Sequence, residues 1–91
     1  MQVNKPVTEV LLKHKEYQQI EQFAMTLEKI AQKLREEGQF TFKQGEKQIE
    51  VIPSSDLKVS YEYTKKANKH SFEIEFDWTE GAAKYGKMDI E

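Results

Sequence analysis

The chain has 91 residues, of which 37% are hydrophobic and 33% charged, with 14 Lys and Arg against 16 Asp and Glu and no cysteine. A chain this short folds around one modest core, so a deep enzyme cleft is not expected. The lack of cysteine excludes disulfides, thiolate nucleophiles and thiolate-bound metal centres, and it fits a reducing compartment. Apolar runs such as Val10-Leu11-Leu12 fall far short of the roughly 20 residues of a membrane span, which predicts a soluble cytoplasmic protein.

The first 17 residues contain a polar start and one candidate strand. Residues 1–6 show no periodicity and are interpreted as a flexible N-terminus. Residues 7–17 mix β-branched and apolar side chains with charges, which favours an extended strand, and its lysines are typical of a sheet edge. Its facing is ambiguous, because Val10 and Leu12 lie on one side of a strand and Leu11 lies on the other.

An amphipathic helix of about five turns follows. Its apolar side chains recur at spacings of three and four and form one stripe, made of Ile20, Phe23, Ala24, Leu27, Ile30, Ala31 and Leu34. Gly38 stands where a helix commonly ends in a left-handed residue. Gln18 and Gln19 are poor N-caps, so the sequence places the first helical residue only to within two or three positions.

After Gly38 the hydrophobic period changes to 2, which predicts four strands. The first pair turns at Gly45 and ends before Pro53, which cannot donate a ladder hydrogen bond. The second pair is joined by a polar tip at residues 65–70. Its apolar side chains all fall on one face and are Leu57, Val59, Tyr61, Tyr63, Phe72, Ile74, Phe76 and Trp78. That regular alternation fixes the strand register, because a slip of one residue would bury carboxylates.

These elements predict an α+β fold, a two-layer sandwich with one amphipathic helix packed on a five-stranded, mainly antiparallel sheet in the order β-α-β-β-β-β. Residues 7–80 form the single expected domain and residues 81–91 a C-terminal tail. The position of the first strand in the sheet is open. The predicted core draws on both layers and contains Phe23, Leu27, Ile30, Leu34, Tyr61, Phe72, Ile74, Phe76 and Trp78.

Several of these patterns occur in a recognisable order. They are a leading strand, the helix pattern from Leu27 to Gly38, the strand end Val51-Ile52-Pro53, the strand Leu57-Lys58-Val59 and the strand Phe72-Glu73-Ile74-Glu75-Phe76-Asp77-Trp78. Over residues 10–80 the chain thereby resembles the amphi-Trp domain family. It departs from that family in its weak helix cap and in the residues 79–91 that follow the tryptophan. The resemblance implies a small prokaryotic domain without an assigned activity and supplies no catalytic, cofactor-binding or metal-binding residue.

The candidate functional face is an acidic row of Glu62, Glu73, Glu75 and Asp77. If Tyr61 lies opposite Ile74, then Glu62 faces Glu73 and Lys58 faces Asp77, whereas a shift of two residues places Lys58 opposite Glu75. Like charges placed opposite one another suit a divalent cation or a basic partner. The structural alternative is a solvated sheet face that keeps the protein soluble.

The remaining candidates are weaker. Trp78 is either a partner-binding anchor or, from its phase with Phe72, part of the core or its edge, which is the favoured interpretation. A basic tip of Lys65, Lys66, Lys69 and His70 is interpreted as a solvated turn rather than a phosphate grip, because the neighbouring acidic face repels nucleic acid. His14 and His70 lack partners at metal-ligand spacing, so neither a metal centre nor a catalytic base is expected.

Two functions therefore stand at this stage. The first is a small non-enzymatic binding or assembly module that contacts protein partners, including copies of itself, through sheet edges and the acidic face. The alternative is a protein that binds a cation or a small ligand through the carboxylate row. No cofactor, nucleic acid or membrane is expected as a partner.

Overall fold

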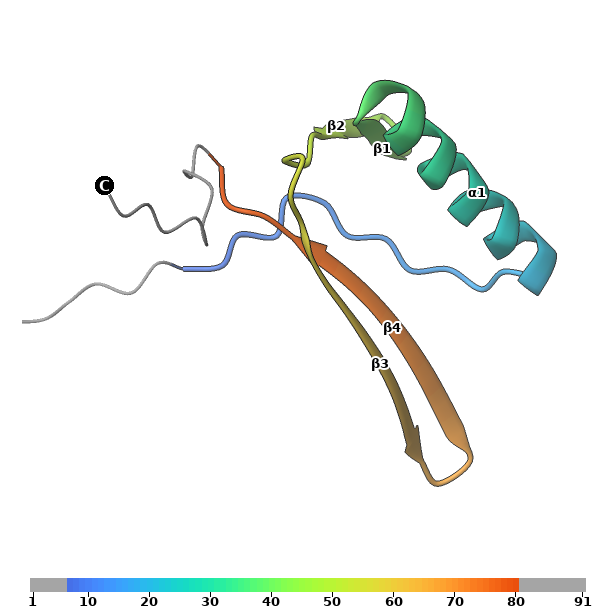
Figure 1. Ribbon diagram of the computed structural model, residues 1–91. Coiled ribbons are helices and arrows are strands. Elements are labelled where there is room, and N and C mark those ends of the chain that lie inside the picture. The colour runs from blue at the N-terminus through green and yellow to red at the C-terminus, as the bar shows by residue number, and fades with distance from the viewer. Residues whose placement is uncertain (1–6, 81–91) are drawn as a thin grey trace, which may run out of the picture. The chain divides into compact units, whose positions relative to one another are not determined.

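The computed structural model describes residues 7–80. The predictions of a flexible N-terminus at 1–6 and a tail at 81–91 lie outside the described residues. Along the chain the elements are α1 (Ile20–Glu37), β1 (Phe40–Gln44), β2 (Lys47–Val51), β3 (Lys58–Lys66) and β4 (Lys69–Asp77) (Figure 1). The chain divides into two units after Ile52, so α1 with β1 and β2 forms one unit and β3 with β4 the other.

Helix α1 ends at the Gly38 cap as its sequence predicts, and it begins at Ile20, within the range that the sequence leaves open. Gln19 precedes it without a side-chain cap hydrogen bond, although its carbonyl accepts the first helical hydrogen bond from the amide of Phe23 at 3.1 Å. At the other end Gly38 adopts φ 70°, and its amide donates to the carbonyl of Leu34 at 3.0 Å. Glycine takes this left-handed conformation without a Cβ penalty, so Gly38 both ends the helix and turns the chain into β1.

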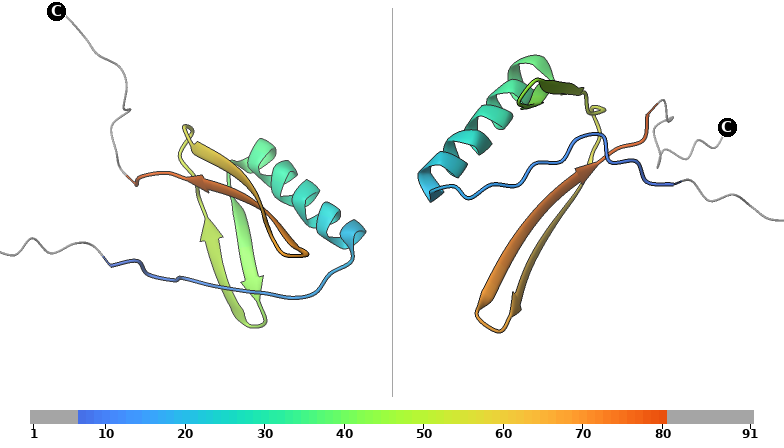
Figure 2. Two further views of the ribbon diagram at one scale, coloured as in Figure 1. Left: turned by 90° about the horizontal axis from the view of Figure 1, so that it is seen from below. Right: turned by 180° about the vertical axis from the view of Figure 1, so that it is seen from behind.

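Strands β1 and β2 form an antiparallel hairpin beside the C-terminal part of α1 (Figure 2). Phe42 pairs with Ile49 and Phe40 with Val51, so these four apolar side chains share one face. All four are half-buried, whereas the alternate side chains Thr41 and Glu50 are exposed. The apolar side chains of the hairpin thus lie on the face turned to the helix, which explains why apolar and polar residues alternate along β1 and β2.

Strands β3 and β4 form a second antiparallel hairpin of two nine-residue strands. Tyr61 pairs with Ile74 and Tyr63 with Phe72, which places the predicted apolar residues on one face. A two-residue turn at Ala67 and Asn68 joins the strands, shorter than the six-residue tip expected from the sequence. Ala67 adopts a positive φ of 54°, a value that favours glycine.

The α+β class is confirmed, but the single five-stranded sheet is wrong. The four strands form two separate two-stranded sheets, β1–β2 and β3–β4. Residues 52–57 separate β2 from β3 and include Pro53, which lacks a ladder donor. Sequence-adjacent strands pair as a tendency and not as a rule, and a strand end marked by proline is where that tendency fails.

The first predicted strand is also wrong, because residues 7–19 form neither helix nor strand. Leu11 and Leu12 instead line a small cavity of about 410 Å³ together with Gln48 and Ile49 of β2. The ambiguous facing of this segment gives the physical reason, since neither of its sides is apolar enough to specify one register on a sheet. Only Leu12 is half-buried among residues 7–19.

Among residues 7–80 no side chain is fully buried. Of the predicted core, four side chains are half-buried, namely Ile30, Leu34, Phe76 and Trp78. The other five are exposed, namely Phe23, Leu27, Tyr61, Phe72 and Ile74. Their joint packing in one core stays a prediction.

Candidate functional site

The acidic row lies on the polar face of the β3–β4 hairpin, and its register is the first of the two alternatives. Tyr61 lies opposite Ile74, and Glu62 therefore lies opposite Glu73. Lys58 lies opposite Asp77, as that register predicts. The Cβ atoms of directly opposed residues in an antiparallel pair are about 4.5–5.5 Å apart, close enough for the two glutamates to repel each other.

On this polar face the carboxylates follow one another along β4, and a pair of lysines lies beside the turn. Glu73, Glu75 and Asp77 follow one another on β4, while Lys66 and Lys69 form the last pair before the turn. All of these side chains are exposed. The ion pairs found among residues 7–80 lie elsewhere, at His14–Glu16 and Lys33–Glu37. The acidic row therefore presents its carboxylates to water, with Lys58 opposite Asp77 and no ion pair to the row among residues 7–80.

The acidic row does not converge on a cation site within the described part of the chain. No three His, Asp or Glu side chains among residues 7–80 are arranged to hold a metal ion. A pleated strand explains this, because Glu73, Glu75 and Asp77 are spread along one line at intervals of two residues. Calcium needs six to eight oxygen ligands around one point.

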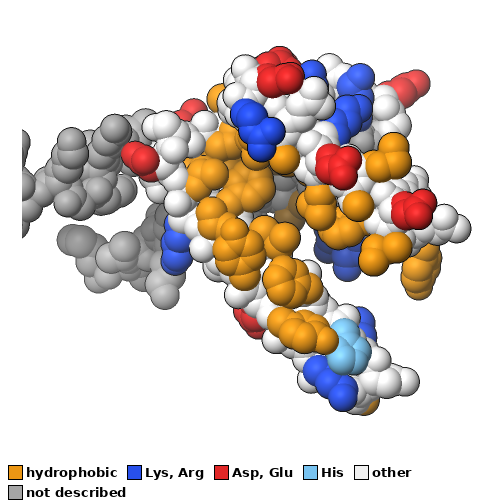
Figure 3. Space-filling view, turned by 45° about the vertical axis from the view of Figure 1, so that its right-hand side comes forward, with side chains coloured by type: hydrophobic (Ala, Val, Ile, Leu, Met, Phe, Trp, Pro, Cys, Tyr) orange, Lys and Arg blue, Asp and Glu red, His pale blue; other side chains and the backbone are white. Residues whose placement is uncertain are grey.

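The opposite face of this hairpin is aromatic. Its side chains form an orange row that runs along one face of β3–β4 toward the tip (Figure 3). At the tip the Tyr63 hydroxyl and His70 Nδ1 are 2.6 Å apart, and their rings stack at 5.8 Å. At the other end the Phe76 and Trp78 rings stack at 6.0 Å with an interplanar angle of 18°. Trp78 thus continues the aromatic face beyond the last paired residue of β4.

The contact of Tyr63 with His70 was not predicted from the sequence. The residues are diagonal neighbours, because Tyr63 pairs with Phe72 and His70 pairs with Lys65. Diagonal neighbours are reachable for aromatic side chains. Once the register is known, the contact can be found, because His70 lies two residues before Phe72, the partner of Tyr63.

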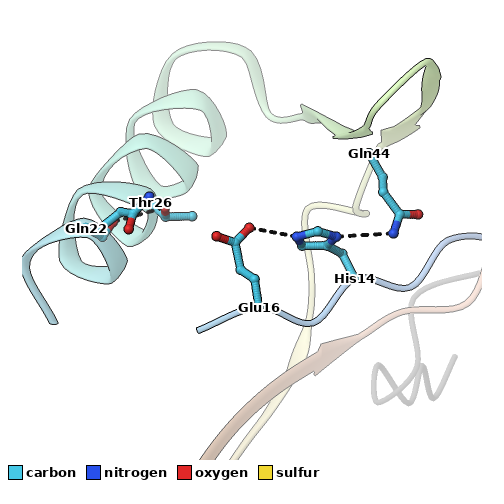
Figure 4. Close-up of polar contacts among 5 residues, drawn as sticks. All are labelled: His14, Glu16, Gln22, Thr26 and Gln44. Carbon is cyan, nitrogen blue, oxygen red and sulfur yellow. Dashed lines mark hydrogen bonds and ion pairs between the residues drawn. The ribbon is translucent and has the colours of Figure 1, made fainter. Parts of the chain in front are cut away.

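A second polar cluster joins the leading segment to β1. The side-chain amide of Gln44 lies 3.1 Å from His14 Nδ1, and His14 Nε2 lies 2.6 Å from a Glu16 carboxylate oxygen (Figure 4). An amide that donates to Nδ1 leaves Nε2 as the nitrogen that donates to Glu16. The hydrogen bond from His14 lowers the pKa of Glu16, with a smaller contribution from Gln18.

The helix and the first hairpin enclose a groove of about 510 Å³. Its apolar wall is made by Ile30, Phe40, Phe42 and Val51, and its rim carries Lys29, Lys33 and Lys43. Lys33 is held 2.8 Å from Glu37, whose carboxylate raises the pKa of that lysine. Of this wall, Ile30 belongs to the predicted core. The sequence gives no sign of the lysine rim, which brings together residues from α1 and β1.

The family model for the Amphi-Trp domain matches residues 5–91. The chain belongs to the Amphi-Trp domain family. The match takes in the alternating strand from Phe72 to Trp78, whose acidic and aromatic faces are described above. It also includes residues 79–91, so the residues after the tryptophan are not a departure from the family. No curated protein and no solved structure matches this Amphi-Trp chain.

Among residues 7–80 of this Amphi-Trp domain, no helix combines the length and the apolar character needed to cross a membrane. The stripe of apolar residues on α1 alternates with charged ones such as Glu28 and Lys29, as is typical of a helix that packs along one side.

Proposed function

We propose that this Amphi-Trp protein is a small non-enzymatic module of the cytoplasm that binds protein partners through its sheet edges and its acidic face of Glu62, Glu73, Glu75 and Asp77. The observation that carries the proposal is the direct opposition of Glu62 and Glu73 in a nine-residue hairpin whose polar face is exposed. A basic segment of a partner removes the repulsion within that pair and gains charge-assisted hydrogen bonds.

The strand edges support the same function. Among residues 7–80 each strand pairs with its hairpin neighbour, and the amide and carbonyl groups of its other edge can pair with an added strand. β4 combines such an edge with three acidic side chains, Glu73, Glu75 and Asp77. An extended basic peptide laid along β4 would use backbone hydrogen bonds for affinity and its lysines or arginines for selectivity.

Binding fits this surface better than catalysis. An acid or base catalyst works at a substrate held in a pocket that positions the reacting atoms. The acidic row lies instead on an open strand face, and its members follow one line along β4. Among the described residues this arrangement offers partners an open surface of negative charge.

The test compares the natural protein with a variant that lacks three carboxylates, Glu62→Gln/Glu73→Gln/Glu75→Gln, as baits for proteins from the source cell. We expect proteins retained by the natural chain at low salt to be lost with the variant and released by raised salt. The control Thr64→Ala/Ser71→Ala alters another cross-strand pair of the same face without changing charge, and it should retain the same proteins. Equal retention of these proteins by the variant that lacks three carboxylates, or no retained protein at all, would contradict the proposal.

A further inference from the structure

The outer edge of β2 faces the leading segment, residues 7–19, within one unit of the chain. Among residues 7–80, strand β2 pairs with β1 and with no other strand. Leu11 and Leu12 line the cavity of about 410 Å³ together with residues 46–49, the last three of which belong to β2. Successive side chains of a strand point to opposite faces, so a cavity lined by consecutive strand residues runs along the edge of that strand. All of these residues belong to the unit that ends at Ile52.

The register of the first hairpin determines which backbone groups this edge presents. In a hairpin with a two-residue turn, the residues that flank the turn form a hydrogen-bonded pair, and bonded and non-bonded pairs alternate from there. Gln44 and Lys47 flank the turn, so Gln48, which pairs with Lys43, turns its amide and carbonyl away from β1. Gln48 also lines the cavity beside the leading segment. The leading segment therefore covers the first outward backbone groups that an added strand would meet on β2.

The leading segment is attached to the first hairpin by side chains and not by a strand ladder, because residues 7–19 form no strand. One attachment is apolar, at Leu11 and Leu12 beside the cavity. The other is polar, with His14 Nδ1 lying 3.1 Å from the side-chain amide of Gln44 and Glu16 holding the other ring nitrogen (Figure 4). Segments held by few contacts open locally at a small cost in free energy. The leading segment can therefore leave the edge of β2 while the hairpin stays folded.

Uncovered strand edges pair readily with strands of other molecules, and proteins protect them with loops and with lysine side chains. The leading segment supplies both, because Lys13 and Lys15 stand on either side of His14. We infer that the leading segment is a displaceable cover of the outer edge of β2, which is held at Leu12 and His14 and must move away before a strand can pair with β2. The inference rests on the proposed function, since it states how access to one of the binding edges is controlled.

The direct test measures how closely a dissolved molecule approaches the Gln48 amide in the full chain. A soluble gadolinium chelate raises the relaxation rates of amide protons that it can approach in NMR spectra. In the variant Leu12→Ser/His14→Ser, which loses both attachments, we expect this enhancement at Gln48 to rise at least about twofold, because the open state becomes the main one. An unchanged enhancement at Gln48 would overturn the inference.

A matched variant controls for the loss of apolar side chains from the same segment. Val10→Ser/Tyr17→Ser removes two side chains that are not among those lining the cavity, so the enhancement at Gln48 should stay as in the natural chain. Circular dichroism confirms that both variants keep the helix and the strands. An equal rise at Gln48 in both variants would overturn the inference.

A second measurement tests whether the cover keeps added strands away. An uncovered edge of β2 pairs with the same edge of another copy, so Leu12→Ser/His14→Ser should show a higher average mass than the natural chain in sedimentation equilibrium between roughly 10 and 500 µM. Adding Gln48→Pro removes the outward amide without a bond to β1 and should return the mass to that of the natural chain. Equal masses of the natural chain and Leu12→Ser/His14→Ser, or a gain that survives Gln48→Pro, would overturn the inference.

These experiments separate the inference from the proposed function. If Gln48 stays unchanged in Leu12→Ser/His14→Ser but the acidic face still retains partner proteins, the inference fails and the proposed function stands. If Gln48 becomes accessible and the natural chain retains no partner, the cover is supported and the proposed function fails. If Gln48 becomes accessible and partners depend on the acidic face, both are supported.

Discussion

The two hairpins of this protein are built on the same turn and differ in length and in exposure. Each has a two-residue turn whose first residue takes a positive φ, 60° at Gly45 and 54° at Ala67. The β1–β2 hairpin is five residues long on each side, and its inner face is half-buried beside α1. The β3–β4 hairpin is nine residues long on each side, and all of β3 is exposed.

This difference separates two ways in which a hairpin gains stability. Isolated two-stranded hairpins are marginal in water, so a short one needs a packing partner within the fold. The long hairpin has more cross-strand pairs, each of which contributes about 0.2–1 kcal/mol. Four predictions test whether the two hairpins gain their stability in these different ways.

The largest expected effect is on the covered hairpin. Phe42→Ala should lower the free energy of unfolding by about 2 kcal/mol, around half the cost at a fully buried site, because Phe42 is half-buried beside α1. Phe72→Ala in the exposed hairpin should cost less than about 1 kcal/mol at low protein concentration. Urea titrations at a few micromolar protein compare the two, and equal losses would show that both hairpins are covered alike.

The turns provide the next test. Gly45→Ala should destabilise the protein by about 1 kcal/mol, since no neighbouring atom lies within 4 Å of the new Cβ and only the positive φ opposes it. Ala67→Gly should stabilise by about 0.5 kcal/mol, because glycine relieves the same conformation at a cost in chain entropy. Thermal unfolding of both variants would show shifts of opposite sign, and shifts of the same sign would refute the common turn.

Charge on the polar face gives a smaller effect. Glu73→Lys converts the opposed pair with Glu62 from repulsive to attractive and should stabilise by about 0.5 kcal/mol at low salt. Glu75→Lys makes the same change in net charge opposite the uncharged Ser60 and should stabilise less. The difference in the free energy of unfolding between Glu73→Lys and Glu75→Lys should vanish at 1 M salt, as measured by chemical denaturation.

The smallest expected effect is the pH response of the cluster at His14. The folded pKa of Glu16 lies below 4.5, so its bond to His14 stabilises the folded state above the ordinary pKa and that contribution is lost as pH falls through the lowered value. His14→Ala should raise the Glu16 pKa toward 4.5 in a carbon-detected NMR titration, while Gln44→Ala should change it less. An unchanged Glu16 pKa in the first variant would contradict the contact.

The sequence is most informative where a pattern is local and strictly periodic. The helix stripe and Gly38 predict the end of α1, and the alternation around Tyr61 and Ile74 leaves two registers, of which the structure has the first. It is least informative where order depends on pairing between distant segments. Residues 7–17 satisfy the composition of a strand, but mixed faces give them no register, and residues 52–57 interrupt the sheet that short connections predict.

The candidate site shows the same limit. The acidic row follows from the alternation of β4, since side chains two apart share a face. The pair Tyr63 and His70 depends on the diagonal of the finished ladder, and the lysine rim at Lys29 and Lys43 depends on how α1 meets β1. Neither can be read from spacing along one segment.

One short connection joins α1 to the first hairpin. Only Gly38 and Gln39 separate the last residue of α1 from the first residue of β1, and the amide of Gly38 is bonded back to Leu34. Because only two residues separate the two elements, a displacement of β1 also moves the end of α1. A displacement of β1 would therefore wind or unwind the final turn of α1.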